Sequence, residues 1–387
     1  MFRQNGRKES DAAVGSLVAD NTAFALALYQ KLRAESGNLF FSPYSISTAL
    51  AMTYAGARGE TAMQMAQALR FHLDPPQLHA AFANLEATIN SISATGQVQL
   101  SVANALYPQQ GYLFLPDYLA LVAAYYGANI TAVDYRDAAA ACHLINTWVA
   151  EKTAQKIQNL IPPSIIDALT ILVLVNAIYF KGNWASQFDP DLTADTPFWF
   201  EPEQSVSAPL MRQTATFAYG EGEGLQIVSL PYVGDDLSML LLLPRERDGL
   251  AALEENLTAA NLARWGGSLR PSEVDLFLPR FETTFSVCLN DALQALGMVD
   301  AFGPADFSGM TGGGGLFISA VLHKAFIKVN EEGTEAAAAT AVIMSESIPP
   351  PPPVFRADHP FVFLIRENRT GSLLFLGRVA NPAGKND

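Results

Sequence analysis

The chain has 387 residues, half of them hydrophobic, and a formal net charge of −14 at pH 7. This charge argues against nucleic acid and anionic membranes as partners, because both would repel an acidic protein. The length alone would allow two or three domains, but no repeat or long polar linker divides the chain. We expect one domain over residues 13–384, preceded by a polar, disordered segment over residues 1–12.

Two cysteines, Cys142 and Cys288, are too few for a disulfide framework, and we expect both to be buried free thiols. The basic residues near the N-terminus are not followed by an apolar run. The sequence therefore predicts no signal peptide and no membrane segment. We expect a cytoplasmic protein, with an unusual route of secretion left open.

Helical patterns dominate the first part of the chain. Apolar residues four positions apart predict an amphipathic helix over 17–35. Ser42 followed by Pro43 predicts the start of a second helix, since serine is a good N-cap and proline suits the first helical position. A third helix is expected to start by Glu60 and to bury Met63.

The middle of the chain contains a strand that is apolar on both faces. Residues 97–107 alternate as a strand and residues 137–156 read as a helix, whereas residues 170–180 predict a central strand covered on both sides. Asn176 stands in the middle of this strand, where a buried amide must find hydrogen-bond partners. His323 lies on the core row of another alternating segment, LHKAFIKV, and is the candidate partner.

The stretch EEGTEAAAATAVIMSESIPPPPP, over 331–353, combines features that rarely occur together. Its alternate residues Thr334, Ala336, Ala338, Thr340, Val342 and Met344 are small or apolar, so this row could face a core without burying a charge. Taken alone, the alanine-rich run favours a surface helix. The alternating strand before it and the five prolines after it favour instead a segment that can enter a sheet as a strand.

Four long blocks of the chain resemble serpins, in the order found in that family. VNEEGTEAAAATAV resembles the hinge of the serpin reactive centre loop. ADHPFVFLIRENRTGSLLFLGRVANP at 357–382 resembles the C-terminal signature of the family, and LVNAIYFKGNW at 174–184 and NLFFSPYSISTALAMTYAGARGET at 38–61 resemble two further blocks. The resemblance covers almost the whole chain.

The resemblance implies an α+β serpin fold with three β-sheets, about eight or nine helices and an exposed reactive centre loop at 331–353. The helix at 137–156 would lie across the main sheet and yield when a strand enters. The regions called shutter and breach, where sheet strands part, would contain Ser42, Ser45, Asn176, His323 and Trp184. For each polar residue, a satisfied core group is the alternative role.

The same resemblance implies a suicide-substrate inhibitor of serine, or cysteine, endopeptidases. A protease would cleave the loop and form an acyl-enzyme, and it would be trapped when the loop inserts into the main sheet. The hinge would consist of Glu331, Gly333, Thr334, Glu335, Ala336, Ala337, Ala338 and Ala339.

Counting from the hinge as in the family places the reactive bond between Ser347 and Ile348, with Glu346 and Met344 as alternative cleavage positions. A bond directly before proline is a poor substrate for most proteases, so cleavage should lie on the N-terminal side of Ile348. Ser347 suits an elastase-like or subtilisin-like enzyme. Trypsin-like targets are not expected, because no Lys or Arg lies between Lys328 and Arg356.

The sequence lacks motifs that would indicate an enzyme, a metal site or a heparin site. The sequence has no Gly-x-Ser-x-Gly motif, and its five histidines show no metal-ligand spacing, so neither an enzyme nor a metal or other cofactor is expected. The helix predicted over 77–91, where some relatives would bind heparin, contains no Lys or Arg, and heparin is not expected to bind. We expect a monomer. The alternative function is a non-inhibitory serpin-fold binding protein, chaperone or storage protein.

Overall fold

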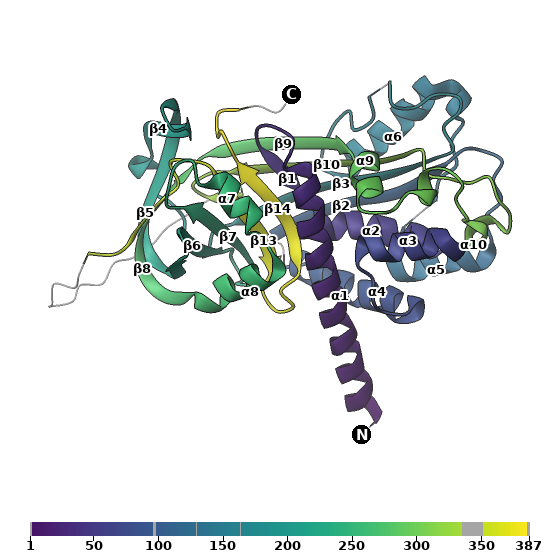
Figure 1. Cartoon of the computed structure of the whole chain (residues 1–387), viewed down its shortest axis with the longest axis horizontal. Coiled ribbons are helices and arrows are strands. Elements are labelled where there is room, and N and C mark those ends of the chain that lie inside the picture. Colours follow the sequence, from purple (N-terminus) through teal and green to yellow (C-terminus); the bar gives the residue numbers. More distant parts are fainter. Residues whose placement is uncertain (1, 96–97, 129, 163, 335–350, 385–387) are drawn as a thin grey trace.

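The computed structural model describes residues 2–95, 98–128, 130–162, 164–334 and 351–384. These residues form an α+β fold with ten α-helices and two hydrogen-bonded β-sheets. The helices are α1 (Phe2–Leu32), α2 (Pro43–Tyr54), α3 (Gly59–Leu69), α4 (Pro75–Ser93), α5 (Pro116–Tyr126), α6 (Ala138–Lys152), α7 (Leu250–Glu255), α8 (Ala259–Ser268), α9 (Asn290–Ala295) and α10 (Ser308–Thr311). Figure 1 shows their arrangement around the two sheets.

The five-stranded sheet is built around one strand, β3, that is buried over residues 172–180. Its members are β2 (Val98–Pro108), β3 (Leu172–Asn183), β9 (Phe281–Cys288), β10 (Ala320–Val329) and the two-residue β11 (Gly333–Thr334). Alternate residues of β3 enter two different cores: Leu174 and Ile178 belong to the larger one, and Val173 and Val175 to a smaller one shared with α6. Burial on both faces explains the continuous apolar sequence of this strand.

The resemblance implied three β-sheets, whereas by hydrogen bonding the described residues form two, because the second sheet is continuous over nine strands. Its members are β1 (Leu39–Phe41), β4 (Ala194–Glu201), β5 (Gln204–Gly222), β6 (Leu225–Pro231), β7 (Leu237–Pro244), β8 (Arg270–Pro279), β12 (Val354–Arg356), β13 (Phe361–Glu367) and β14 (Leu373–Val379). The 19-residue β5 pairs with β4, β6 and β8 along its length, and this pairing makes the sheet continuous.

The N-terminal segment differs from the expectation of disorder over residues 1–12. Helix α1 begins at Phe2, and its first turns extend beyond the other elements in Figure 1. Once the later turns are held by packing, adding polar helix-forming residues such as Arg7 and Lys8 costs little. Farther along, the Asn84 amide donates a hydrogen bond of 3.0 Å to the Ser10 hydroxyl, which ties α1 to α4.

Among the described residues, one helix is long and apolar enough to cross a membrane, namely the Glu9–Leu32 part of α1. Half of the most apolar 18-residue stretch of this helix is buried inside the molecule. Phe24, Leu28 and Leu32 pack into the main core. The apolar composition of α1 thus has a structural explanation within the fold and is weak support for a membrane span.

Two side chains that we expected to be buried, those of Met63 and Cys288, are exposed. Met63 is 56% exposed, because the buried stripe of α3 runs through Thr61, Met65 and Leu69, and a residue two positions from Thr61 lies on the other face. Cys288 is exposed at the end of β9, whose described pairing is with β10 alone, whereas Cys142 is buried as expected.

Candidate functional site

The segment after β10 begins to enter the five-stranded sheet at the seam between β3 and β10. These two strands pair in parallel from Ala320 opposite Val173 up to Phe326 opposite Tyr179, and then separate. Beyond that point β11 pairs antiparallel with the end of β3, with Gly333 opposite Asn183. Strand β2 occupies the other edge of β3 along its whole length. The first two residues after the turn therefore lie on the β10 side of β3, where an inserted strand would start.

Gly333 is required at this position by its backbone and by the space around it. Its φ angle is +137°, a conformation that side chains strongly disfavour. A Cβ atom at Gly333 would lie 2.5 Å from Asn183 Cα and 2.6 Å from the amide nitrogen of Trp184. The close approach of β11 to β3 therefore depends on glycine.

Trp184 fixes the turn that precedes β11. Its indole is buried and stacks on Tyr232, with ring centroids 4.7 Å apart. The indole Nε1 donates to the Asn330 carbonyl at 3.0 Å, and the backbone nitrogen of Trp184 donates to the Glu332 carbonyl at the same distance. The resemblance implies that Trp184 belongs to the shutter and breach regions, and in the structure it binds the carbonyls of Asn330 and Glu332, on either side of Glu331.

Glu331 is held in a buried position by two donors. The residue is 5% exposed, and its carboxylate accepts hydrogen bonds from Arg280 Nε at 2.6 Å and from the Thr193 hydroxyl. Burial opposes ionisation, but the bonds from Arg280 and Thr193 outweigh it and hold the pKa of Glu331 below its usual range. The turn before the hinge is therefore fastened by a charged contact.

A polar cluster lies beneath the same seam, deeper in the molecule. Its members, which we call the seam cluster, are Ser42, Ser45, Asn104, Asn176 and His323. His323 Nε2 accepts from the Ser42 backbone nitrogen at 3.3 Å, so the ring proton is on Nδ1, which donates to the Asn176 side-chain oxygen. Because the ring is fully buried, the pKa of His323 falls to about 3.

The hydrogen bonds of the seam cluster connect the start of α2 to strands β2, β3, β10 and β14. The Ser42 hydroxyl donates to the Leu374 carbonyl at 2.6 Å, and the Asn176 amide donates to both Ser45 Oγ and Asn104 Oδ1. Helix α2 therefore contacts β10 through Ser42 and the β2–β3 pair through Ser45. The four residues expected to meet here do meet.

Asn104 is the member that sequence reasoning missed. It lies on β2 directly opposite Asn176 on β3, and Ser45 Oγ donates to its side-chain oxygen at 3.1 Å. An asparagine inside the alternating stretch at 97–107 was the available signal, but the strand register that sets it opposite Asn176 cannot be read from one strand alone.

The remaining predicted loop residues lie outside the described part of the chain. These are the hinge residues Glu335, Ala336, Ala337, Ala338 and Ala339, the predicted reactive bond Ser347–Ile348, and the alternatives Glu346 and Met344. The chain is described again from Pro351, and the Pro353 carbonyl accepts from the Asp275 backbone nitrogen at 3.0 Å where β12 joins β8.

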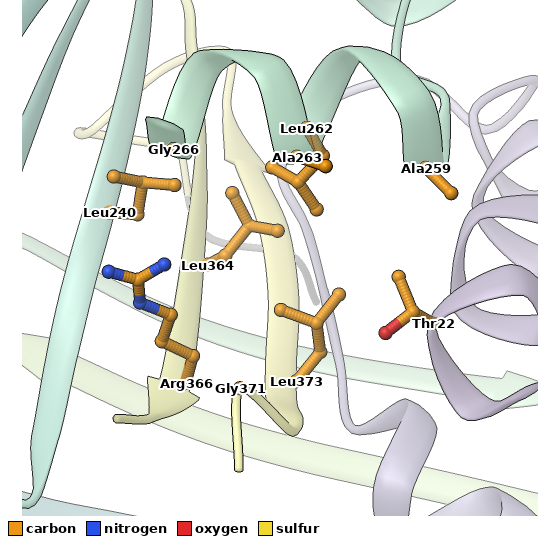
Figure 2. A pocket seen from close by; sticks show the side chains of 10 residues that line it. All are labelled: Thr22, Leu240, Ala259, Leu262, Ala263, Gly266, Leu364, Arg366, Gly371 and Leu373. Carbon is orange, nitrogen blue, oxygen red and sulfur yellow. The ribbon is translucent and has the colours of Figure 1, made fainter. Parts of the chain in front are cut away.

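A separate apolar pocket of about 270 Å³ lies between α1, α8 and strands β7, β13 and β14. Leu262 and Ala263 from α8 face Leu364 across it in Figure 2, and the guanidinium of Arg366 lies at its edge. Burial lowers the pKa of Arg366, and its Nε donates to the Ser238 hydroxyl at 3.4 Å. None of the ion pairs in the described residues involves Arg366.

Within the part of the chain that the structure describes, no group of three His, Cys, Asp or Glu side chains is placed to hold a metal ion. The candidate site is the hinge with the seam below it, where β11 pairs with β3.

Comparison with known proteins agrees with this geometry. The family model described as Serpin (serine protease inhibitor) matches residues 19–382, and the chain belongs to this family. It is 43% identical to human leukocyte elastase inhibitor and 42% identical to human Serpin B3, over 95% of this chain in both cases and over 99% and 100% of those proteins. Human thyroxine-binding globulin complexed with thyroxine has a similar structure, with a TM-score of 0.88 and 31% identity over 96% of this chain and 100% of that one.

Proposed function

We propose that this serpin is a suicide-substrate inhibitor of serine endopeptidases, with cysteine endopeptidases as a further class. The protease cleaves the loop that follows β11 and forms an acyl-enzyme at its nucleophile. The cleaved loop then enters the seam between β3 and β10 before water releases the enzyme. The observation that carries this proposal is the pairing of Gly333 and Thr334 with β3, because it aligns the chain with the seam before any cut.

The energetics favour insertion once the loop is free at one end. The twelve residues from Thr334 to Ser345 would add a strand of about 40 Å at roughly 3.3 Å per residue. Each added hydrogen bond contributes on the order of 1 kcal/mol, and Val342 and Met344 add apolar burial. The uncut protein is then metastable and is protected by a barrier.

The expected targets follow from the loop sequence and from one relative. Cleavage between Ser347 and Ile348 presents a small side chain that suits an elastase-like or subtilisin-like pocket, with cleavage after Glu346 or Met344 as the alternatives. The name of the relative leukocyte elastase inhibitor agrees with an elastase-like target. We further propose that the protein acts as a monomer in the cytoplasm and without heparin.

The test mixes the protein with pancreatic elastase and, separately, with subtilisin. We expect a covalent complex that survives boiling in detergent. We also expect a C-terminal fragment, released by denaturation, whose mass corresponds to a chain that begins at Ile348. Complete cleavage without any detergent-resistant complex, with every serine and cysteine protease tried, would reject the inhibitor proposal.

A non-inhibitory binding function is the second candidate, and the pocket in Figure 2 favours it. Its apolar walls and the Arg366 guanidinium suit an aromatic anion, and a structural relative was solved with bound thyroxine. Titration with 8-anilinonaphthalene-1-sulfonate, compared between the natural protein and Arg366→Gln, tests this. We rank inhibition first, because no residue of the inserting row is charged.

A further inference from the structure

A very short strand attaches the C-terminal end of the proposed reactive loop to the nine-stranded sheet. Strand β12 lies at the edge of that sheet, has three residues and, among the described residues, pairs with β8 alone. The Pro353 carbonyl accepts from the Asp275 backbone nitrogen at 3.0 Å, and the Ala357 backbone nitrogen donates to the Phe277 carbonyl at the same distance. An edge strand with so few backbone bonds opens easily. Side-chain contacts just beyond β12 therefore matter for its attachment.

His359, three residues beyond β12, has an acceptor at each of its ring nitrogens. The residue is 6% exposed. Its Nε2 lies 2.7 Å from the carbonyl oxygen of Pro244, at the end of β7, and its Nδ1 lies 2.9 Å from Asp358 Oδ1. A carbonyl and an ionised carboxylate only accept hydrogen bonds, whereas a neutral imidazole has one donor and one acceptor nitrogen. Both contacts are hydrogen bonds at the same time only if the ring carries two protons and is an imidazolium.

Asp358 is the anion of this arrangement. Burial opposes its ionisation, but the hydrogen bond and charge of His359, together with Arg356, outweigh burial and hold the pKa of Asp358 below its usual range. Arg356 is the last residue of β12, and its Nε donates to the other carboxylate oxygen at 3.1 Å. The contacts therefore run from the end of β7 through His359 and Asp358 to β12. We call Pro244, Arg356, Asp358 and His359 the β12 anchor.

Charged groups on the neighbouring elements are engaged elsewhere or exposed. After β7, Arg245 pairs with Glu221, and the guanidinium carbon of Arg247 lies 4.2 Å from the ring centroid of Trp199 on β4. Across the β5–β8 pair, Arg212 binds Asp275 at 3.0 Å. The other charged residues of β4, of β8 and of the turn after β7 are exposed, namely Asp195, Glu201, Arg270, Glu273, Glu246 and Asp248. Asp358 is thus the charged group that the His359 ring contacts among the described residues.

We propose that His359 is an imidazolium that positions the C-terminal end of the reactive loop, and that loss of one ring proton at alkaline pH releases β12. The neutral ring keeps one of its two hydrogen bonds and turns a lone pair towards the other acceptor, in a buried place where water cannot replace the lost donor. The contribution to stability is present while the ring is charged and is lost as pH rises. The role of the loop rests on the proposed inhibitor function, whereas the charged state of the ring does not.

Release of β12 gives the uncut loop more free chain at its C-terminal end. Its N-terminal end is already aligned with the seam, because Gly333 and Thr334 pair with β3. A longer free segment can enter the seam without being cut, and such a molecule no longer presents its loop to a protease. Alkaline pH should therefore accelerate the spontaneous loss of inhibitory activity.

The first test determines the protonation state of His359. The full chain with nitrogen-15 histidine should give a long-range proton–nitrogen spectrum at pH 7 in which both His359 nitrogens carry a proton, and His359→Gln identifies these signals by their absence. Between pH 7 and pH 9 the Asp275 and Ala357 amides should lose protection from hydrogen exchange by about tenfold, since a charge-assisted hydrogen bond is lost. The Val133 amide, which donates to Pro108 at 2.9 Å in the other sheet, should keep its protection. A neutral His359 ring at pH 7 would overturn the proposal.

The second test measures the half-life of inhibitory activity against subtilisin at pH 7 and pH 9. In the natural protein the half-life should be about tenfold shorter at pH 9. His359→Gln cannot carry a charge and should have a short half-life at both pH values, whereas His359→Lys stays charged at pH 9 and should keep a long one. His143→Gln is the matched control, because His143 is exposed on α6, and it should behave as the natural protein does.

The two tests separate the anchor from the proposed function. If the half-life shortens with pH equally in the natural protein and in His359→Gln, His359 does not position the loop and the proposal is wrong. If no complex with a protease forms at any pH, the proposed inhibitor function fails, and the spectrum and the hydrogen exchange of the first test decide whether His359 is the charged anchor of β12.

Discussion

Gly333 pairs with Asn183 beyond the point where β10 has left β3. The two backbones are so close that a single methyl group on Gly333 would overlap Asn183 Cα and the amide nitrogen of Trp184. The entry point of the seam is thus already occupied by the first residues of the hinge.

Replacing Gly333 with alanine should expel β11 from the seam. The added Cβ clashes with β3, and φ of +137° is strained for alanine, so we expect a loss of about 1–3 kcal/mol from the hinge conformation. Hydrogen exchange at the Thr334 amide should speed up and the number of inhibitor molecules consumed per protease should rise. Gly313→Ala is the control, because a Cβ atom at Gly313 meets nothing within 4 Å; equal effects of the two changes would contradict the role of Gly333.

Replacing Thr334 with arginine should convert the inhibitor into a substrate. The first inserted residue would bring an unpaired cation into the core, and a cost of only about 1.4 kcal/mol in the insertion barrier slows insertion about tenfold. Detergent-resistant complex should largely disappear while cleavage of the loop continues. Thr334→Ser keeps a small side chain and should retain the complex. An unchanged stoichiometry in Thr334→Arg would show that this residue does not enter the core first.

Replacing Arg280 with methionine should destabilise the turn before the hinge. Glu331 would remain buried with its strongest donor removed, at a cost of about 1–3 kcal/mol. Because this contact holds the chain at the entry point of the seam, its loss should make the proposed insertion easier, and spontaneous loss of inhibitory activity on warming should accelerate. The matched control is Arg212→Met, which breaks the more exposed pair with Asp275 and should cost less than about 1 kcal/mol.

The Arg280–Glu331 ion pair also contributes to the pH dependence of folding stability. The pKa of Glu331 is lowered in the folded protein. Its contribution to stability is therefore present above the usual glutamate pKa and is lost as pH falls through the lowered one. Arg280→Met should remove the contribution of Glu331 to the pH dependence of stability. If the free energy of unfolding falls equally with acid in the natural protein and in Arg280→Met, this role of the ion pair is wrong.

Mild acid should weaken the fold through His323. The ring has a folded pKa of about 3 against an ordinary value of 6.5, so the unfolded chain binds one more proton between these values. Stability is complete above pH 6.5 and falls as pH drops towards 3, by about 2 kcal/mol between pH 7 and pH 5. Thermal scans at pH 7 and pH 5 should show a smaller decrease in melting temperature for His323→Gln than for the natural protein. The control is His143→Gln, at an exposed position on α6, whose melting temperature should fall as much as that of the natural protein.

The sequence predicted those parts of the fold that depend on local pattern. The continuous apolar run at 170–180 identified the central strand, and Ser42 and Pro43 marked the start of α2, where Ser45 N donates to Ser42 Oγ at 3.1 Å. Asn176 and His323 were paired correctly, because a buried amide and a buried imidazole each require a partner.

Features that depend on tertiary contacts were not predictable in this way. The partnership of Arg280 with Glu331 and the position of Asn104 opposite Asn176 depend on the register of strands far apart in sequence. The helical conformation of residues 2–12 was missed because their polar composition indicated disorder, whereas the packed part of α1 supports them. Residues 335–350 lie outside the described structure, so the reactive bond stays a prediction from the sequence.

Strand β13 is hydrogen-bonded to β7 on one edge and to β14 on the other, so the last described part of the chain lies inside the nine-stranded sheet. Phe361, Phe363 and Ile365 are fully or almost fully buried there. A protein cut before Ile348 would thus be two polypeptides in one particle, which gel filtration in native buffer cannot distinguish from the intact chain. The smaller, C-terminal polypeptide would stay bound through its strands, and only a denaturant that unfolds the nine-stranded sheet would release it.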